Sequence, residues 1–168
     1  MLRRLVVVAR AEELATPEEL STARAVGRLL ADNGITLVHD GREVGAMGLA
    51  VETCAQAGGR LAQAAPLSVE AVGTVDAYLA LPHGFSALDD AFAIWASPAA
   101  AGRELPVGLL DDGEYYSGLL RHATDSTLDH FVRESQRGRL IMAKRPDDLL
   151  RRLSDYKPPE TRRGNDFE

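Results

Sequence analysis

An imidazole and a carboxylate stand seven residues apart in the segment from Pro82 to Asp90. The imidazole belongs to His83 and the carboxylate to Asp90. An imidazole can act as an acid, a base or a hydrogen-bond donor near neutral pH. A carboxylate can stabilise positive charge or orient water beside a sugar. Both residues are therefore candidate catalytic groups, although a carboxylate in the first turn of a helix can also serve only to favour the helix dipole.

The same segment predicts the start of a helix. Ser86 is a favourable N-cap residue, and Asp89 follows at the position of the capping-box carboxylate. A helix that begins at Ser86 and runs to about Ala96 would carry Asp90 in its first turns, where the carboxylate can point into a crevice beside the preceding strand.

A second candidate region is the glycine-bearing turn from His39 to Gly48. Such turns let backbone N–H groups and a helix N-terminus approach an anion closely. Asp40 and Glu43 put negative charge where an anion would bind, and Arg42 can offset one of them. Glycine is also ordinary at strand-to-helix turns, so the spacing leaves an anion site and a purely structural turn as alternatives.

Short apolar runs alternate with stretches of helical periodicity along most of the chain. Buried parallel strands are expected at residues 5–8, 35–38, 77–81, 106–110 and 140–142. Thr16, Pro17 and Glu19 form a capping-box pattern with proline at the first helical position, so a helix is expected from there to Asn33-Gly34. Further helices are expected at residues 45–56, 86–96, 126–136 and 146–153.

This alternation predicts an α/β fold of Rossmann type, with a doubly wound, mainly parallel sheet flanked by helices. Residues 1–153 are expected to form a single domain of this kind, and residues 154–168 a polar C-terminal tail. In an open parallel sheet, ligands bind outside the carboxyl ends of the strands, near the switch point of strand order. The turn at His39 and the segment at Pro82 each follow such a strand.

Both segments resemble motifs of one known family. Leu37 to Gly48 is similar to the pattern L-V-Y-G-G-G-x-x-G-L-M-G, and Ala80 to Asp90 to the pattern A-L-P-G-G-x-G-T-L-E-E. Leu105 to Tyr116 resembles K-P-V-G-L-L-N-x-x-G-Y-Y. These patterns belong to the LONELY GUY family of nucleoside 5′-monophosphate phosphoribohydrolases, often misnamed lysine decarboxylases. The resemblance implies a Rossmann-like homodimer that cleaves the N-glycosidic bond of a nucleotide, giving free base and ribose 5-phosphate.

The resemblance also assigns roles to residues, and several positions depart from the pattern. Asp90 stands at the family's catalytic glutamate and is one methylene shorter. Ala87 replaces a threonine that would contact phosphate, and an arginine-lysine motif expected before residue 75 is missing. Glycines of the pattern are replaced by Asp40, Arg42, His83 and Ser86. The residues that the resemblance predicts as ligand contacts are Gly41, Arg42, Gly45, Met47, Gly48, Pro82, Gly84, Ser86 and Ala87.

Two functions are compatible with this sequence. The first is a non-catalytic relative that binds a nucleotide or nucleoside-like small molecule, or a protein partner, and the loss of phosphate donors favours it. The alternative is an N-glycoside hydrolase of altered specificity that uses Asp90, with His83. No cofactor and no metal are expected, because His122 and His130 lie eight residues apart without an H-E-x-x-H pattern and Cys54 has no companion cysteine.

Charge and composition limit which classes of binding partner and which cellular compartment are expected. The formal net charge of −6 argues against nucleic-acid binding, which depends mainly on lysine and arginine. A single cysteine cannot form an internal disulfide, and no apolar run is long enough to span a membrane, so a cytoplasmic protein without membrane contact is expected. A homodimer is expected from the resemblance and from an apolar helix surface made of Ala91, Phe92, Ile94 and Trp95.

Overall fold

The computed structural model describes residues 2–9, 15–65, 73–82, 84–96, 104–111, 113–128 and 133–158. Within these ranges the strands are β1 (Arg4–Val8), β2 (Thr36–His39), β3 (Leu61–Gln63), β4 (Ala77–Ala80), β5 (Val107–Leu110) and β6 (Leu140–Ala143). The helices are α1 (Pro17–Asp32), α2 (Gly45–Gln56), α4 (Phe85–Ala96), α5 (Ser117–Leu128), α6 (Glu134–Gly138) and α7 (Pro146–Asp155).

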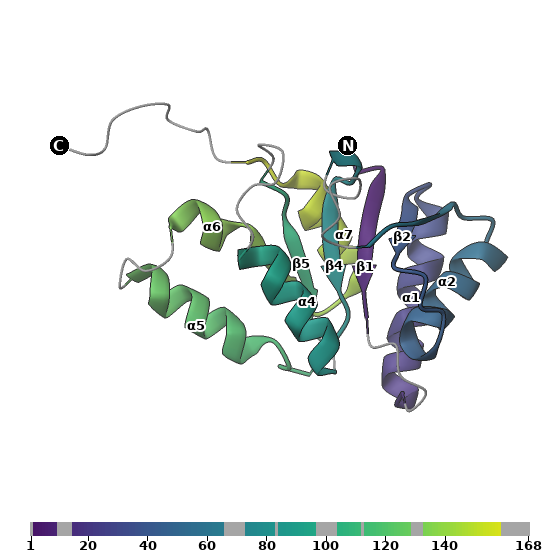
Figure 1. Cartoon of the computed structure of the whole chain (residues 1–168), viewed down its shortest axis with the longest axis horizontal. Helices are drawn as coiled ribbons and strands as arrows, with labels where there is room; N and C mark the ends of the chain where they lie inside the picture. The colour runs from purple at the N-terminus through teal and green to yellow at the C-terminus, as the bar shows by residue number, and fades with distance from the viewer. Residues whose placement is uncertain are drawn as a thin grey trace.

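The strands form one parallel sheet in the order β3-β2-β1-β4-β5-β6 (Figure 1). The chain builds outward from β1 to β2 and β3, and then returns to the other side of β1 with β4. The switch point of strand order therefore lies between β1 and β4. This arrangement confirms the predicted Rossmann-like, doubly wound sheet, and it predicts a ligand crevice at the carboxyl ends of these two strands.

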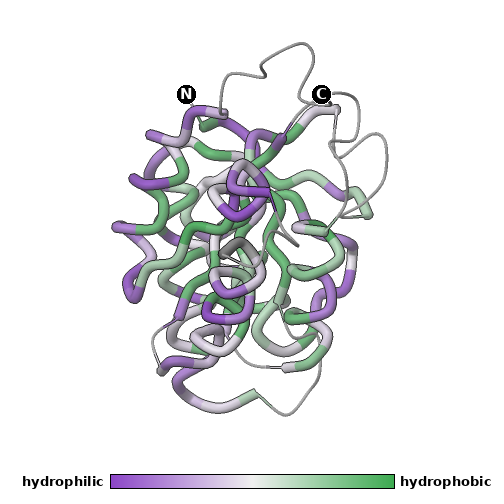
Figure 2. The backbone as a smooth tube through the Cα atoms, turned by 90° about the vertical axis from the view of Figure 1, so that its left-hand side faces the viewer, coloured by the Kyte–Doolittle hydropathy of each residue, from purple (hydrophilic) through white to green (hydrophobic). Residues whose placement is uncertain are grey.

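Alternate residues of each strand face two separate packing layers. Leu5 and Val7 of β1 pack with apolar residues of α1, α2 and α7, whereas Val6 and Val8 pack with those of α4 and α5. These four side chains are at most 2% exposed. Figure 2 shows hydrophobic stretches in the interior and hydrophilic ones on the outer turns. Burial on both faces explains why the strands read as continuous apolar runs in the sequence.

The start of α1 is fixed by the capping box that the sequence predicts. The Glu19 backbone N–H donates to the Thr16 hydroxyl at 3.2 Å, and the Thr16 N–H donates to the Glu19 carboxylate at 2.6 Å. The helix ends before Gly34, which has a φ of 64° that few other residues adopt readily. Both predicted ends of this helix are confirmed.

Two elements differ from the sequence-based expectation. A helix was expected at residues 126–136, but α5 begins at Ser117 and ends at Leu128, and the separate short α6 begins after Arg133, which has extended backbone. The early start of α5 follows from Asp111, whose carboxylate accepts hydrogen bonds from the Tyr116 N–H and the Ser117 hydroxyl. The edge strand β3 was not expected, because three partly exposed residues carry no apolar run.

None of the helices in the described ranges is long and apolar enough to cross a membrane.

Candidate functional site

The turn between β2 and α2 keeps its glycines for reasons of backbone geometry. Gly41 and Gly45 have φ values of 91° and 60°. A Cβ atom on Gly48 would collide with the backbone carbonyl of Glu43. Because a side chain would strain or block each of these positions, the glycines are explained by the shape of the turn alone. Their role in contacting a ligand stays a prediction.

Arg42 is the centre of the charged groups in this turn. Its guanidinium lies 2.5 Å from the Asp40 carboxylate, and its backbone N–H donates to the same carboxylate at 2.9 Å. Burial raises the pKa of Asp40, but the hydrogen bonds and charge of Arg42 outweigh this effect, so the pKa of Asp40 lies below its usual value. The hydrogen bond to Asp40 also raises the pKa of Arg42. The two residues form an ion pair at the carboxyl end of β2.

Asp90 of α4 faces the same guanidinium from the other side of β1. The nearest distance between Arg42 Nη2 and Asp90 Oδ2 is 3.9 Å, and the Asp90 side chain is 33% exposed. Partial burial raises the pKa of Asp90; the charge of Arg42 opposes this shift, whereas Asp40 and Asp89 add to it. A carboxyl group with a raised pKa beside a sheet's switch point can exchange protons or stabilise a developing cation. The Arg42–Asp90 contact therefore joins the two regions that the sequence predicts as a site.

The expected helix start at Ser86 is wrong. The helix α4 begins at Phe85, after Gly84 with a φ of 88°, and the Leu88 N–H donates to the Gly84 carbonyl at 3.3 Å. Ser86 therefore lies inside the first turn, where its hydroxyl cannot cap the helix. Its Oγ is buried and meets no hydrogen-bond partner in the part of the chain that the structure describes. Asp89 consequently does not take the capping-box role.

The remaining predicted residues separate into two groups. The side chains of Met47 and Ala87 are 2% and 0% exposed and pack into the core, and Pro82 is also buried. Their contribution to a ligand site would come through the backbone. His83 lies outside the described residues, so its role as a catalytic partner of Asp90 stays a prediction.

His39 is a residue at this site that the sequence reasoning did not single out. It is the last residue of β2 and is 5% exposed, and its Nδ1 accepts a hydrogen bond from the Gly41 N–H at 3.3 Å. This bond places the proton of the neutral ring on Nε2. Its place at the carboxyl end of a predicted strand was the signal that could have identified it.

The predicted apolar surface of α4 is wrong for three of its four residues. Ala91, Ile94 and Trp95 are at most 3% exposed, because they pack against the chain's own sheet, and the Trp95 indole donates to the Gln136 carbonyl at 2.8 Å. Phe92 is 43% exposed. Phe85, at the start of the helix, is 87% exposed. The apolar surface of α4 therefore consists of two phenylalanines and not of the expected set.

Within the described ranges, no group of three or more histidine, cysteine, aspartate or glutamate side chains is placed to hold a metal ion.

The parallel sheet, its switch point and the glycine-bearing turns define a Rossmann-type protein with a candidate ligand site at the carboxyl ends of β1, β2 and β4. The chain belongs to the family described as "Possible lysine decarboxylase", the family of the LONELY GUY proteins, whose sequence model matches residues 70–153, half of the chain. This match confirms the resemblance inferred from the motifs.

Relatives in plants have phosphoribohydrolase names. A "Probable cytokinin riboside 5'-monophosphate phosphoribohydrolase" of Oryza sativa subsp. japonica is 29% identical over 157 residues, which cover 79% of this chain and 64% of the relative. A cytokinin riboside 5'-monophosphate phosphoribohydrolase of Arabidopsis thaliana is 28% identical over 148 residues, covering 74% of this chain and 65% of the relative. The chain thus spans just under two-thirds of the length of these relatives.

Solved structures with the same fold include proteins of a different kind. The molybdenum cofactor binding protein of the phototrophic bacterium Rippkaea orientalis has a TM-score of 0.62 and 21% identity, over 92% of this chain and 96% of that one. The molybdenum cofactor carrier protein of Chlamydomonas reinhardtii has a TM-score of 0.64 and 15% identity, over 92% of this chain and 97% of that one. At this identity the likeness concerns the fold alone.

Proposed function

We propose that this chain binds a nucleoside-like small molecule, in preference to a nucleotide, between the β2–α2 turn and α4, without the ordinary phosphoribohydrolase activity of its relatives. The observation that carries the proposal is the ion pair between Arg42 and Asp40. Arg42 is the one cation that the two family motifs contain in this chain. Its guanidinium is already occupied by a carboxylate of its own turn.

A phosphate dianion is disfavoured at this turn for a simple electrostatic reason. It would have to displace Asp40 from Arg42 and then lie close to the displaced carboxylate. Repulsion between such charges at a partly buried site can cost several kcal/mol, which corresponds to orders of magnitude in binding. Ala87 also lacks the hydroxyl that would contact phosphate. An uncharged nucleoside avoids this repulsion, so it is the favoured ligand class.

The proposal is tested by the response of the melting temperature to adenosine and to adenosine monophosphate, measured for the wild type and Asp40→Asn. Removing the charge of Asp40 frees Arg42, so we expect Asp40→Asn to be stabilised by the monophosphate more than the wild type is. Asp32→Asn is the matched control, because it removes a carboxylate that pairs with Arg28 on an exposed face of α1. Equal responses of all three proteins to the monophosphate would contradict the proposal.

The second candidate is an N-glycoside hydrolase, and the raised pKa of Asp90 beside Arg42 favours it. A screen for nucleobase release on nucleosides and nucleotides, with the wild type and Asp90→Asn, distinguishes the two candidates. A hydrolase should lose most of its activity in Asp90→Asn while its fold is kept, because the amide is nearly isosteric. Activity that survives this substitution undiminished would rule out the role of Asp90 in catalysis.

We also propose that the chain forms a homodimer, with no nucleic-acid or membrane partner. The support is a hollow between α4 and α5 of about 780 Å³, lined in part by Phe85, Phe92 and Leu119. Exposed aromatic residues of this kind are enriched at protein interfaces. Light scattering should report a dimer at micromolar concentration, and Phe85→Ser should weaken it. A stable wild-type monomer would contradict this proposal.

A further inference from the structure

A second hollow, of about 700 Å³, opens at the carboxyl ends of β5 and β6. Its walls come from the turn between β5 and α5, the turn between β6 and α7, and one face of α7. Because β5 and β6 lie on the far side of β4 from β1, this hollow is separate from the candidate site that contains Arg42 and Asp90. Its volume lies in the range of small-molecule sites.

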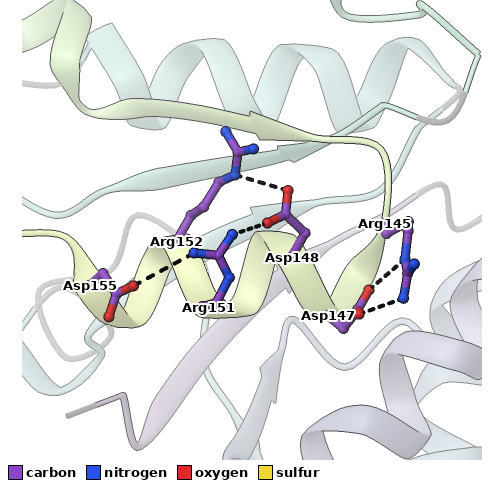
Figure 3. A network of polar contacts seen from close by, with 6 residues as sticks. All are labelled: Arg145, Asp147, Asp148, Arg151, Arg152 and Asp155. Atoms are coloured by element: carbon purple, nitrogen blue, oxygen red, sulfur yellow. Dashed lines mark hydrogen bonds and ion pairs between the residues drawn. The ribbon is translucent and has the colours of Figure 1, made fainter.

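The wall formed by α7 consists of charges that neutralise one another (Figure 3). Arg145 lies 2.6 Å from Asp147, and Arg152 lies 2.9 Å from Asp148. Arg151 pairs with Asp148 as well. The arginines on this wall are therefore engaged by aspartates of the same helix, and they offer a ligand little uncompensated charge.

The opposite wall holds a buried carboxylate that is only partly satisfied. Asp111 follows β5 directly and is 3% exposed. Its Oδ2 accepts from the Tyr116 N–H at 3.1 Å and, over a longer 3.3 Å, from the Ser117 hydroxyl. Its Oδ1 is buried and has no hydrogen-bond partner among the described residues. Buried carboxylate oxygens normally have donors, so this atom is poised to accept one more.

Two further charges on this hollow are uncompensated. Glu114 lies on the β5–α5 turn beside Asp111, and Lys144 follows β6. Neither forms an ion pair with any residue that the structure describes. Glu114 also holds a φ of 67°, where the family pattern has glycine, and Asp111 stands where the pattern has asparagine. Both substitutions add a carboxylate to the same wall.

We propose that this hollow is a binding site for a small zwitterion, whose ammonium group donates to Asp111 and Glu114 and whose acidic group pairs with Lys144. The ammonium supplies several donors, so it can replace the long contact from Ser117 and satisfy the second oxygen of Asp111. The free charges of the hollow are opposite in sign to those of such a ligand: two carboxylates can share its ammonium group, and the ammonium of Lys144 can pair with its acidic group. The hollow is independent of the function proposed for the candidate site that contains Arg42 and Asp90.

The test is a titration of the isotope-labelled full chain, followed by backbone amide NMR shifts. Three probes share a four-carbon chain: 4-aminobutyrate carries both charges, butylamine only the ammonium and butyrate only the carboxylate. We expect 4-aminobutyrate to shift the amides of the β5–α5 and β6–α7 turns, butylamine to shift them less, and butyrate to leave them unchanged. No shift at these turns with 4-aminobutyrate would overturn the proposal, as would an equal response to butyrate.

Variants separate a ligand contact from a purely structural role of Asp111. Asp111→Asn keeps an oxygen for the Tyr116 N–H but removes the charge, so we expect affinity for 4-aminobutyrate to fall by about tenfold or more. Asp32→Asn removes an exposed carboxylate of α1, which pairs with Arg28 and lies outside the lining, so it should change affinity by less than about twofold. Should Asp111→Asn fail to fold, the exposed Glu114→Gln serves instead and should weaken binding in the same direction. Unchanged affinity in the folded variant would contradict the proposal.

Discussion

The carboxyl edge of the sheet carries charged residues in two places, and they are arranged in opposite ways. At the candidate site beside β1, Arg42 and Asp40 neutralise each other within one turn, and Asp90 faces the same guanidinium. At the hollow beside β5 and β6, Asp111 keeps an oxygen without a donor, and Glu114 and Lys144 have no ion-pair partner among the described residues.

The difference shows that the same edge of one sheet can hold two kinds of polar site. A paired charge has little electrostatic free energy left for a ligand, because a new ion must first separate the existing pair. An unpaired buried carboxylate gains a hydrogen bond when a donor arrives. We therefore expect the candidate site to select against anions, and the hollow to select for a ligand that carries an ammonium group.

The largest effect should come from the tight backbone contact between Gly48 and the β2–α2 turn. In Gly48→Ala, the new Cβ would collide with the carbonyl of Glu43, so the turn that carries Arg42 must shift. We expect a loss of about 1–3 kcal/mol in the free energy of unfolding, the usual cost of overpacking. Gly113 is the matched control on the β5–α5 turn, because a Cβ there would meet no atom within 4 Å. Chemical denaturation that finds equal losses in Gly48→Ala and Gly113→Ala would show that the β2–α2 turn is not the tighter one.

A smaller effect is expected at Glu114, where a residue with a side chain occupies the left-handed region. That conformation costs about 1–2 kcal/mol for most residues, and glycine recovers part of it. Glu114→Gly should therefore raise the free energy of unfolding by about 0.5–1 kcal/mol. Glu114→Ala removes the carboxylate but keeps the strain, so it should give no such gain. Equal stabilisation by both variants would indicate that charge, and not backbone strain, is responsible.

The smallest effect concerns the pH dependence of the Arg42–Asp40 pair. The pKa of Asp40 is lowered in the folded chain, so its contribution to stability is present above its ordinary value of 3.8 and is lost as the pH falls through the lowered pKa. Because the Arg42 side chain is 53% exposed, solvent screens this partly buried pair, and such pairs contribute about 1 kcal/mol or less. The wild type should therefore be only slightly more stable than Asp40→Asn at neutral pH, and the difference should vanish in acid. Melting curves of both proteins, from neutral pH to below 3.8, test this prediction. A stability difference between them that grows as the pH falls would contradict it.

Much of the fold follows from the sequence, because burial on both faces makes each central strand a continuous apolar run. The start of α1 was also predicted correctly, since Thr16 and Glu19 exchange both hydrogen bonds of a capping box. The same pattern at Ser86 and Asp89 failed. There the helix begins one residue earlier, after Gly84 in a left-handed conformation, and a propensity for capping cannot reveal that backbone path.

The candidate site was only partly predictable, because several of its contacts form only in the folded chain. The sequence indicated that Arg42 could offset one of its acidic neighbours, and the structure pairs it with Asp40 and brings Asp90 to 3.9 Å. The sequence did not single out Asp111 as a site residue, and it did not predict strand β3. The Asp111 carboxylate accepts hydrogen bonds from Tyr116 and Ser117, and β3 forms by pairing with β2. These contacts exist only in the folded chain, so the sequence alone could not predict either feature.

The most direct test of the account is the release of adenine from adenosine monophosphate by the purified wild type, measured by chromatography beside a plant phosphoribohydrolase relative. Because Arg42 is occupied by Asp40 and the threonine hydroxyl of the pattern is replaced by Ala87, we expect no adenine above the protein-free blank while the relative turns over normally. Adenine release at a rate comparable to that of the relative, and lost in Asp90→Asn, would contradict the account and establish the chain as an ordinary phosphoribohydrolase.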